Sequence, residues 1–246
     1  LTGSDQTPIG TEDNAFKGKF DGLDNSIFGL SIDNRDNKKG KATGLFGFTD
    51  GAIMGNVTLI AGTDGISVQG GDKDTGAFIG HAVNTTVKGV NSTLKVSGTN
   101  NVGGIIGYFN ARKAVVSHSA NHGKVYGSGN DVKVGGIAGR MGSNDEAGTA
   151  LPNNMELSYS CNFGEVGSNT GNANVGGLLG WQEQGSPDDE THYMLHNCYN
   201  MGIVPTNQDS DNGGVLGCID HLGEVQNCYN AKKVSQILVC RQIQGK

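Results

Sequence analysis

Gly103-Gly104-Ile105-Ile106-Gly107 and Gly135-Gly136-Ile137-Ala138-Gly139 are two copies of a glycine-bracketed apolar step that occurs six times in this chain. The other copies are Gly44-Leu45-Phe46-Gly47, Gly76-Ala77-Phe78-Ile79-Gly80, Gly176-Gly177-Leu178-Leu179-Gly180 and Gly213-Gly214-Val215-Leu216-Gly217. Self-similarity of this kind is typical of repeat proteins, in which each unit packs on the next. The step therefore predicts a stack of similar units.

The spacing of the copies gives the size of one unit. Their closing glycines stand at positions 47, 80, 107, 139, 180 and 217, so successive steps are 33, 27, 32, 41 and 37 residues long. We take the shortest step as the bare repeat and the extra residues as surface loops, which add little closure entropy. A second motif, Asn-x-Gly-x-Val, begins at Asn121, Asn162 and Asn200, and its last copy, at Asn230, has Lys232 in place of glycine.

Apolar runs within each repeat are short, rich in β-branched residues and bounded by Gly, Asn, Asp or Ser. This pattern is typical of strands and turns rather than of helices. Three short strands with their turns need roughly 20 to 30 residues, in agreement with the shortest repeat. We therefore predict an all-β fold, a right-handed parallel β-helix (β-solenoid) of about six to seven coils.

Composition supports one elongated domain. The chain has 42 glycines but only 4 prolines among 246 residues, and 35% of its residues are hydrophobic. We predict a single β-solenoid over residues 1–246, with N-terminal opening strands at 1–35 and repeats at 36–234. Residues 235–246 are predicted to form a C-terminal strand or the cut edge of a longer array.

Charge and hydropathy exclude several classes of protein. The net charge of −6 provides no basic face for nucleic acid. No apolar run is long enough to predict a transmembrane helix. Because the chain begins at Leu1 rather than Met, we interpret it as a segment whose signal or anchor has been removed, and expect a monomer or part of a longer multidomain chain.

Two copies of the motif read Gly-Leu-apolar-Gly, namely Gly44-Leu45-Phe46-Gly47 and Gly177-Leu178-Leu179-Gly180. They resemble the GLUG repeat of bacterial surface and secreted proteins. Examples are the repeat regions of IgA-specific metallopeptidases and adhesins. Segments 16–22 and 26–32 resemble the strand pair that precedes such repeats. The resemblance implies a β-helix and an extracellular or bacterial cell-surface location. It brings no catalytic residues, and the chain lacks the His-Glu-x-x-His motif of a zinc peptidase.

The residue after each motif should form one row if the coils stack in register. These residues are Phe48, His81, Tyr108, Arg140, Trp181 and Cys218. Consecutive aromatic and cationic side chains suit a sugar ring or a peptide, so we predict a ligand-binding face at Tyr108, Arg140 and Trp181. The alternative is that these side chains only shield the bend of the coil.

The two longest insertions should leave the solenoid beside this row. One contains Asp145 and Glu146, and the other contains Glu183, Asp188, Asp189 and Glu190. Grouped carboxylates could coordinate calcium or supply an acid–base pair for polysaccharide cleavage, but acidic loop tips are more often simply solvated. We include Asp188, Asp189 and Glu190 in the predicted ligand-binding set. We assign no catalytic residue and no metal site, and calcium is the one cofactor left open.

Aligned polar residues suggest stabilising devices. Asn121, Asn162, Asn200 and Asn230 predict a ladder of side-chain amides at a turn. Cys198 and Cys228 each stand two residues before a ladder asparagine. Stacking would place them at disulfide distance with parallel Cβ vectors, which is poor geometry, so buried free thiols are favoured over a disulfide.

These observations favour a non-enzymatic extracellular or cell-surface repeat module, adhesin-like or stalk-like, that binds a glycan or a host protein. The alternative is a polysaccharide lyase or glycoside hydrolase, because the same scaffold can support that chemistry.

Overall fold

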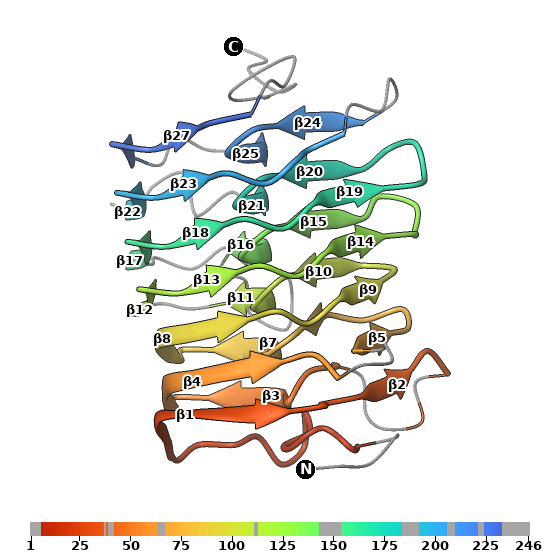
Figure 1. The fold of residues 1–246 in the computed structure, drawn as a ribbon, viewed down its shortest axis with the longest axis vertical. Coiled ribbons are helices and arrows are strands. Elements are labelled where there is room, and N and C mark those ends of the chain that lie inside the picture. The colour runs from red at the N-terminus through yellow and green to blue at the C-terminus, as the bar shows by residue number, and fades with distance from the viewer. Residues whose placement is uncertain are drawn as a thin grey trace.

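The computed structural model describes residues 6–36, 38, 42–62, 67–110, 113–142, 154–183, 192–205, 210–220 and 224–232. Over these residues the chain is a stack of parallel strands (Figure 1), which confirms the predicted all-β parallel solenoid. From the N-terminus upward in Figure 1, the front strands run from left to right and the strands behind them return, so the coil is right-handed as predicted.

Four sheets run the length of the described solenoid. Sheet A contains β3 (Phe46–Asp50), β7 (Ile79–Val83), β11 (Ile106–Asn110), β16 (Ala138–Gly142), β21 (Leu179–Gln182) and β25 (Leu216–Ile219). Sheet C contains β2 (Ile32–Asn34), β5 (Val68–Gly70), β9 (Val96–Gly98), β14 (Val125–Gly127) and β19 (Val166–Ser168). Sheet D contains β6 (Thr75–Gly76), β10 (Asn101–Gly103), β15 (Lys133–Gly135), β20 (Asn174–Gly176) and β24 (Asp211–Gly213).

Sheet B is the widest and contains eleven strands. Its long strands in the first coils are β1 (Lys19–Phe28), β4 (Ile53–Ile60) and β8 (Thr86–Ser92). In later coils a corner divides each strand into two parts. The first parts are β12 (Lys113–Ser117), β17 (Asn154–Ser158), β22 (His192–His196) and β26 (Glu224–Gln226). The second parts are β13 (Ala120–Asn121), β18 (Cys161–Asn162), β23 (Tyr199–Asn200) and β27 (Tyr229–Asn230).

Two details differ from the sequence-based expectation. Each complete coil contributes to four sheets, whereas three strands were expected, because the chain also turns at the glycine-rich bend between β10 and β11, which separates sheet D from sheet A. The opening segments 16–22 and 26–32 do not form a strand pair. Residues 19–22 and 26–28 of these segments belong to the single strand β1, which pairs with β4 and has a register irregularity between Asp21 and Asn25.

The core is a continuous column of apolar side chains inside the coil, mostly aliphatic, with Phe46, Phe78 and Phe109 among them. The two apolar residues of each glycine-bracketed step point inward, and Ile105, Ile106, Ile137 and Leu178 are at most 1% exposed. Sheet C adds the valine that closes the second motif, such as Val125, which is fully buried. Equivalent residues of successive coils therefore pack on one another, as the repeat predicted.

The motif glycines are required by lack of space. A Cβ atom on Gly135 would lie 1.8 Å from the carbonyl oxygen of Ala138, and one on Gly139 would lie 2.4 Å from the backbone nitrogen of Val102. Neither glycine has a positive φ angle. The bend between sheets D and A is therefore so tight that backbone occupies the volume of a side chain.

Gly135→Ala should destabilise the protein by roughly 3 kcal/mol, because backbone atoms would have to move to admit the methyl group. The matched control is Gly62→Ala, since a Cβ atom there meets its nearest neighbour at 3.4 Å. The control should stay within about 0.5 kcal/mol of the parent. Urea unfolding followed by circular dichroism measures both, and equal stabilities of the two variants would contradict this explanation.

The predicted asparagine ladder is present. Asn121 donates from Nδ2 to Oδ1 of Asn162, Asn162 donates in the same way to Asn200, and Asn200 to Asn230, each at 2.8 Å. Each of the first three side chains also bonds the backbone two residues later, as Asn162 does with the carbonyl and the N–H of Gly164. The ladder therefore fixes the turn within each coil and links one coil to the next.

Asn162→Ala should cost roughly 3 kcal/mol, because it removes two buried ladder hydrogen bonds and both side-chain hydrogen bonds to the backbone of Gly164. Asn230→Ala, at the partly exposed last position, should cost about 1 kcal/mol. Thermal melting compares the two variants. A loss at position 230 equal to the loss at position 162 would show that the buried ladder is not what stabilises the turn.

The cysteines that the structure describes are free thiols, as expected: Cys161, Cys198, Cys218 and Cys228. Cys240 and the predicted C-terminal segment 235–246 lie outside the described residues.

Candidate functional site

The residues that follow the glycine-bracketed steps do form one row, on sheet A. Phe48, His81, Tyr108, Arg140, Trp181 and Cys218 are register partners on successive strands. The Phe48 and His81 rings stack at 4.6 Å, and His81 meets Tyr108 edge-on at 4.7 Å. The row predicted from the motif is confirmed, and its members are in direct contact.

Arg140 lies between two rings of the row. Its guanidinium carbon is 4.5 Å from the centre of the Tyr108 ring and 4.9 Å from that of Trp181. The same guanidinium makes a two-pronged ion pair with Glu183, in which Nε lies 3.0 Å from Oε2. The Tyr108 hydroxyl also donates to Glu183, at 3.4 Å. Cation–π contacts and the carboxylate together hold Arg140 in one orientation.

These contacts define what the row can offer a ligand. Tyr108 is only 6% exposed, and burial raises the pKa of its phenol. The ring faces are largely covered by neighbouring coils, so the row is not an open aromatic platform. Of the acidic residues predicted beside the row, Glu183 is there. Asp145, Glu146, Asp188, Asp189 and Glu190 lie outside the described residues.

A second row, on sheet D, faces the first across the glycine bend. Its members occupy equivalent positions on successive coils: Asp74, Asn101, Lys133, Asn174 and Asp211. Sequence reasoning missed this row. The signal was available, because each residue stands two positions before the first glycine of a motif.

Contacts between the rows create a fixed polar cluster. His81 Nδ1 lies 2.7 Å from Asp74 Oδ2, and Asn101 Nδ2 donates to Asp74 Oδ1 at 2.6 Å. Further along the solenoid, the Lys133 ammonium lies 4.9 Å from the centre of the Trp181 ring. Both carboxylate oxygens of Asp74 are thus held by neighbours, although each retains capacity to accept another hydrogen bond.

A pocket of about 250 Å³ opens at this cluster. Its floor and sides include Asp74, His81, Asn101, Tyr108 and Arg140, and residues 10–12 of the N-terminal segment form another wall. Parallel bridges from Ile9 to Phe46 and from Phe16 to Thr49 hold that segment against β3. The volume is below the roughly 300–1,000 Å³ of pockets for drug-sized ligands, so the pocket suits a group of about one ring.

Asp220 lies near the opposite end of the row. Burial raises the pKa of its carboxyl group, while a hydrogen bond with the Trp181 side chain acts in the other direction. The charge of Glu183 raises this pKa further. Two carboxyl groups in different environments therefore lie at the Trp181 end of the row.

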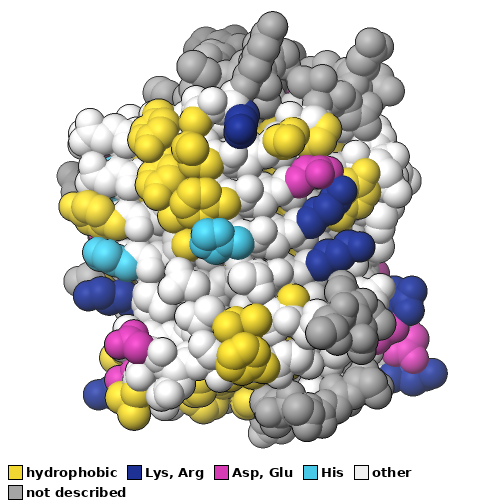
Figure 2. Space-filling model, viewed as in Figure 1, with side chains coloured by type: hydrophobic (Ala, Val, Ile, Leu, Met, Phe, Trp, Pro, Cys, Tyr) yellow, Lys and Arg dark blue, Asp and Glu magenta, His cyan; other side chains and the backbone are white. Residues whose placement is uncertain are grey.

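Sheet B presents a separate aromatic surface. Figure 2 shows hydrophobic side chains gathered on this face, and Phe163 and Tyr229 are 40% and 54% exposed. The rings of His122 and Phe163 stack at 4.5 Å, and those of Tyr199 and Tyr229 at 5.3 Å. Each of these ring pairs joins residues of successive coils, so the contacts link one coil to the next.

Within the described ranges, no group of three or more His, Cys, Asp or Glu side chains is arranged to hold a metal ion. The same part of the chain has no helix long and apolar enough to cross a membrane.

Comparisons with known proteins show the fold and one local relative. No family model matches the chain. A stretch of 111 residues, 44% of the chain, is 40% identical to halomucin from Haloquadratum walsbyi, of which it covers 1%. The crystal structure of the "putative immunoglobulin A1 protease" from Bacteroides ovatus matches with a TM-score of 0.60 and 20% identity, over 90% of this chain and 61% of that one. At this identity, the structural match shows a shared fold.

Asp220→Asn should stabilise the protein at pH 7. Folding raises the pKa of Asp220 above its ordinary value of 3.8. The folded protein therefore tolerates the protonated carboxyl group better than the charged carboxylate, and it loses stability as the pH rises through the folded-state pKa. Asparagine keeps an oxygen acceptor but carries no charge. The melting temperature should therefore rise at pH 7, and the difference should vanish near pH 3.

Asp13→Asn, on an exposed turn, is the control for a general loss of negative charge. If it gives the same pH-dependent gain, burial of Asp220 is not the cause.

Proposed function

We propose that this chain is a non-enzymatic extracellular or cell-surface module that carries GLUG-type repeats and binds a glycan in the pocket beside His81. Two observations support the location: the β-helix is shared with a structure named for a protease of an immunoglobulin, and the local relative is named as a mucin. Immunoglobulins and mucins are extracellular molecules. The solenoid then serves as a rigid support that displays its binding site away from its point of attachment.

We infer the chemical class of the ligand from the residues that line the pocket. A sugar ring presents hydroxyl groups at its rim and C–H groups on its faces. The pocket provides Asp74 and Asn101 for hydroxyl groups, and Phe48 and Tyr108 as aromatic walls. The lining is mainly polar, with Phe48 and Tyr108 beside it, and polar side chains held in fixed positions can orient a small polar ligand.

The support for a glycan is stronger than that for a host protein. A pocket of about 250 Å³ admits one ring of a chain but offers little area to a folded partner, which requires roughly 800 Å² on each side. A ligand with a single terminal sugar in the pocket and further sugars at the partly exposed side chains of Arg140 and Trp181 is the form that this geometry favours.

A second candidate function is cleavage of a polysaccharide. It is favoured by Glu183 and Asp220, two carboxyl groups near Trp181, because glycoside hydrolysis uses one protonated and one ionised carboxyl group. Binding remains our first proposal, since Glu183 is already engaged by Arg140 and Tyr108.

The experiment is a glycan array probed with the labelled protein, followed by calorimetry with the best ligand. Asp74→Asn and His81→Ala should each weaken binding at least ten-fold, about 1.4 kcal/mol, and Arg140→Ala combined with Trp181→Ala should weaken longer ligands. Lys124→Ala, at a partly exposed ion pair outside the pocket, should bind as the parent does.

Unchanged binding by the Asp74 and His81 variants, with their melting temperatures preserved, would place the ligand elsewhere. Incubation with the same polysaccharides separates the two candidate functions, because release of reducing ends would establish cleavage.

A further inference from the structure

One position, at the corner between the two parts of each sheet B strand, is occupied by serine in some coils and by cysteine in others. It is the residue two places before each ladder asparagine, and in four successive coils it is Ser119, Ser160, Cys198 and Cys228. All four side chains make the same hydrogen bond, to the carbonyl oxygen two residues earlier. The donor–acceptor distances are 3.0 Å, 2.8 Å, 3.3 Å and 3.3 Å in coil order.

This corner does not need sulfur. Serine satisfies it in two coils, where Ser160 Oγ also accepts from the N–H of Ser119 at 3.2 Å. Cys198 Sγ takes the same role for the N–H of Ser160 at 3.4 Å. The hydrogen-bonding pattern is therefore met by either residue, and the two cysteines fall on consecutive coils.

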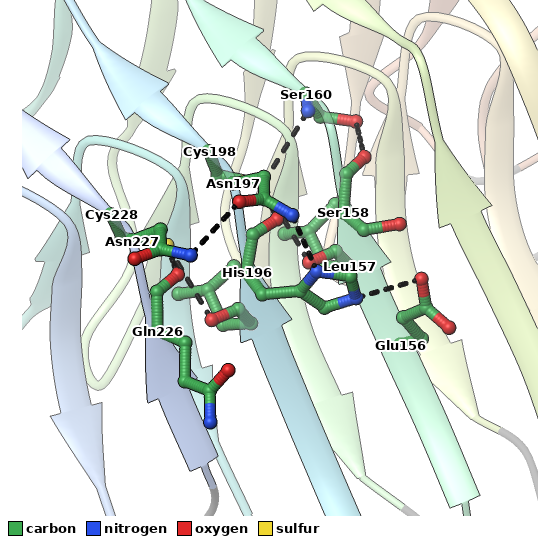
Figure 3. A network of polar contacts seen from close by, with 11 residues as sticks. Glu156, Leu157, Ser158, Ser160, His196, Asn197, Cys198, Gln226, Asn227 and Cys228 are labelled. Carbon is green, nitrogen blue, oxygen red and sulfur yellow. Dashed lines mark hydrogen bonds and ion pairs between the residues drawn. The ribbon is translucent and has the colours of Figure 1, made fainter.

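The two cysteines are opposite each other (Figure 3). Their neighbours pair in register, His196 with Gln226 and Tyr199 with Tyr229. Adjacent parallel strands lie about 4.8 Å apart, within the roughly 4.4–6.8 Å between the Cα atoms of a disulfide. The thiols of Cys198 and Cys228 lie close enough for each to shift the pKa of the other. In-register cysteines have parallel Cβ vectors, so a covalent bond requires rotation of both side chains and a small shift of the two strands toward each other.

We propose that Cys198 and Cys228 are the two halves of an oxidisable site that forms a disulfide between consecutive coils, with a low-molecular-weight disulfide as the oxidant. The bond joins the last two coils that the structure describes.

The order of reaction follows from exposure and charge. Cys198 is fully buried, whereas Cys228 is only partly buried. A hydrogen bond that the Cys198 thiol can donate to the Cys228 thiolate lowers the pKa of Cys228 to about 7 and raises that of Cys198. Cys228 is therefore the thiolate that meets the oxidant first.

The chemistry balances in two exchanges. The Cys228 thiolate attacks one sulfur of the small disulfide, which forms a mixed disulfide and releases one small thiolate. That thiolate takes the proton of Cys198, whose sulfur then attacks the Cys228 sulfur and displaces the second small thiolate. Two protein thiols are oxidised, and one small disulfide is reduced to two thiols.

The consequence is protection of the solenoid end. Repeat proteins are held by contacts between neighbouring units, so a terminal unit can separate without the rest. A bond between Cys198 and Cys228 opposes that separation and restricts the unfolded chain. The other described cysteines have no thiol opposite them, since Cys161 pairs with Tyr199 and Cys218 with Trp181.

The test treats the reduced full chain with oxidised glutathione and maps its peptides by mass spectrometry without reduction. We expect a Cys198–Cys228 cross-link, a higher melting temperature, and reversal of both by dithiothreitol. Cys198→Ser places at this corner the residue that the preceding coils use, so it should fold, gain one glutathione on Cys228 and show no such rise. Cys218→Ser should behave as the parent does.

Failure of the parent to form this cross-link, a cross-link to another cysteine, or a melting temperature that does not rise on oxidation would each overturn the proposal. The readouts require no glycan, so they are independent of the proposed binding function.

Discussion

The close approach of backbone to backbone at the glycine bend is the constraint on which the rest of this structure depends. At Gly135 and Gly139, neighbouring main-chain atoms occupy the space in which a Cβ atom would lie. The bend can therefore turn the chain from sheet D to sheet A within two residues, and it does so at the same place in every coil. Because the turn is equally tight each time, equivalent residues of successive coils are brought into register.

Register in turn makes the ladders possible. An asparagine amide carries both a donor and an acceptor, so an in-register column can pair each side chain with the next and still bond its own turn. Asn162 has these contacts because Asn121 and Asn200 occupy the same position in the adjacent coils. The stacked rings on sheet B follow the same logic, in which chemistry repeated in the sequence becomes contact in space.

The candidate site depends on two registers at once. The row on sheet A places Phe48, His81 and Tyr108 in contact, and the row on sheet D places Asp74 beside Asn101. The bend between the sheets then brings Asp74 to His81. The pocket forms where the N-terminal segment lies against this cluster. A mutation at the bend is thus expected to alter the site as well as the stability.

The sequence by itself determined the periodic part of this protein: a parallel solenoid, the inward apolar pairs, the asparagine ladder and the row from Phe48 to Cys218. These features depend on residues that recur, and recurrence is visible without coordinates. The tertiary structure alone decided the fourth sheet, the single opening strand β1, the partnership of Asp74 with His81 and the enclosure of Arg140 by Tyr108, Trp181 and Glu183. The physical reason is that such contacts join unlike positions of different sheets, and their formation depends on the angle of the bend and the space left beside it.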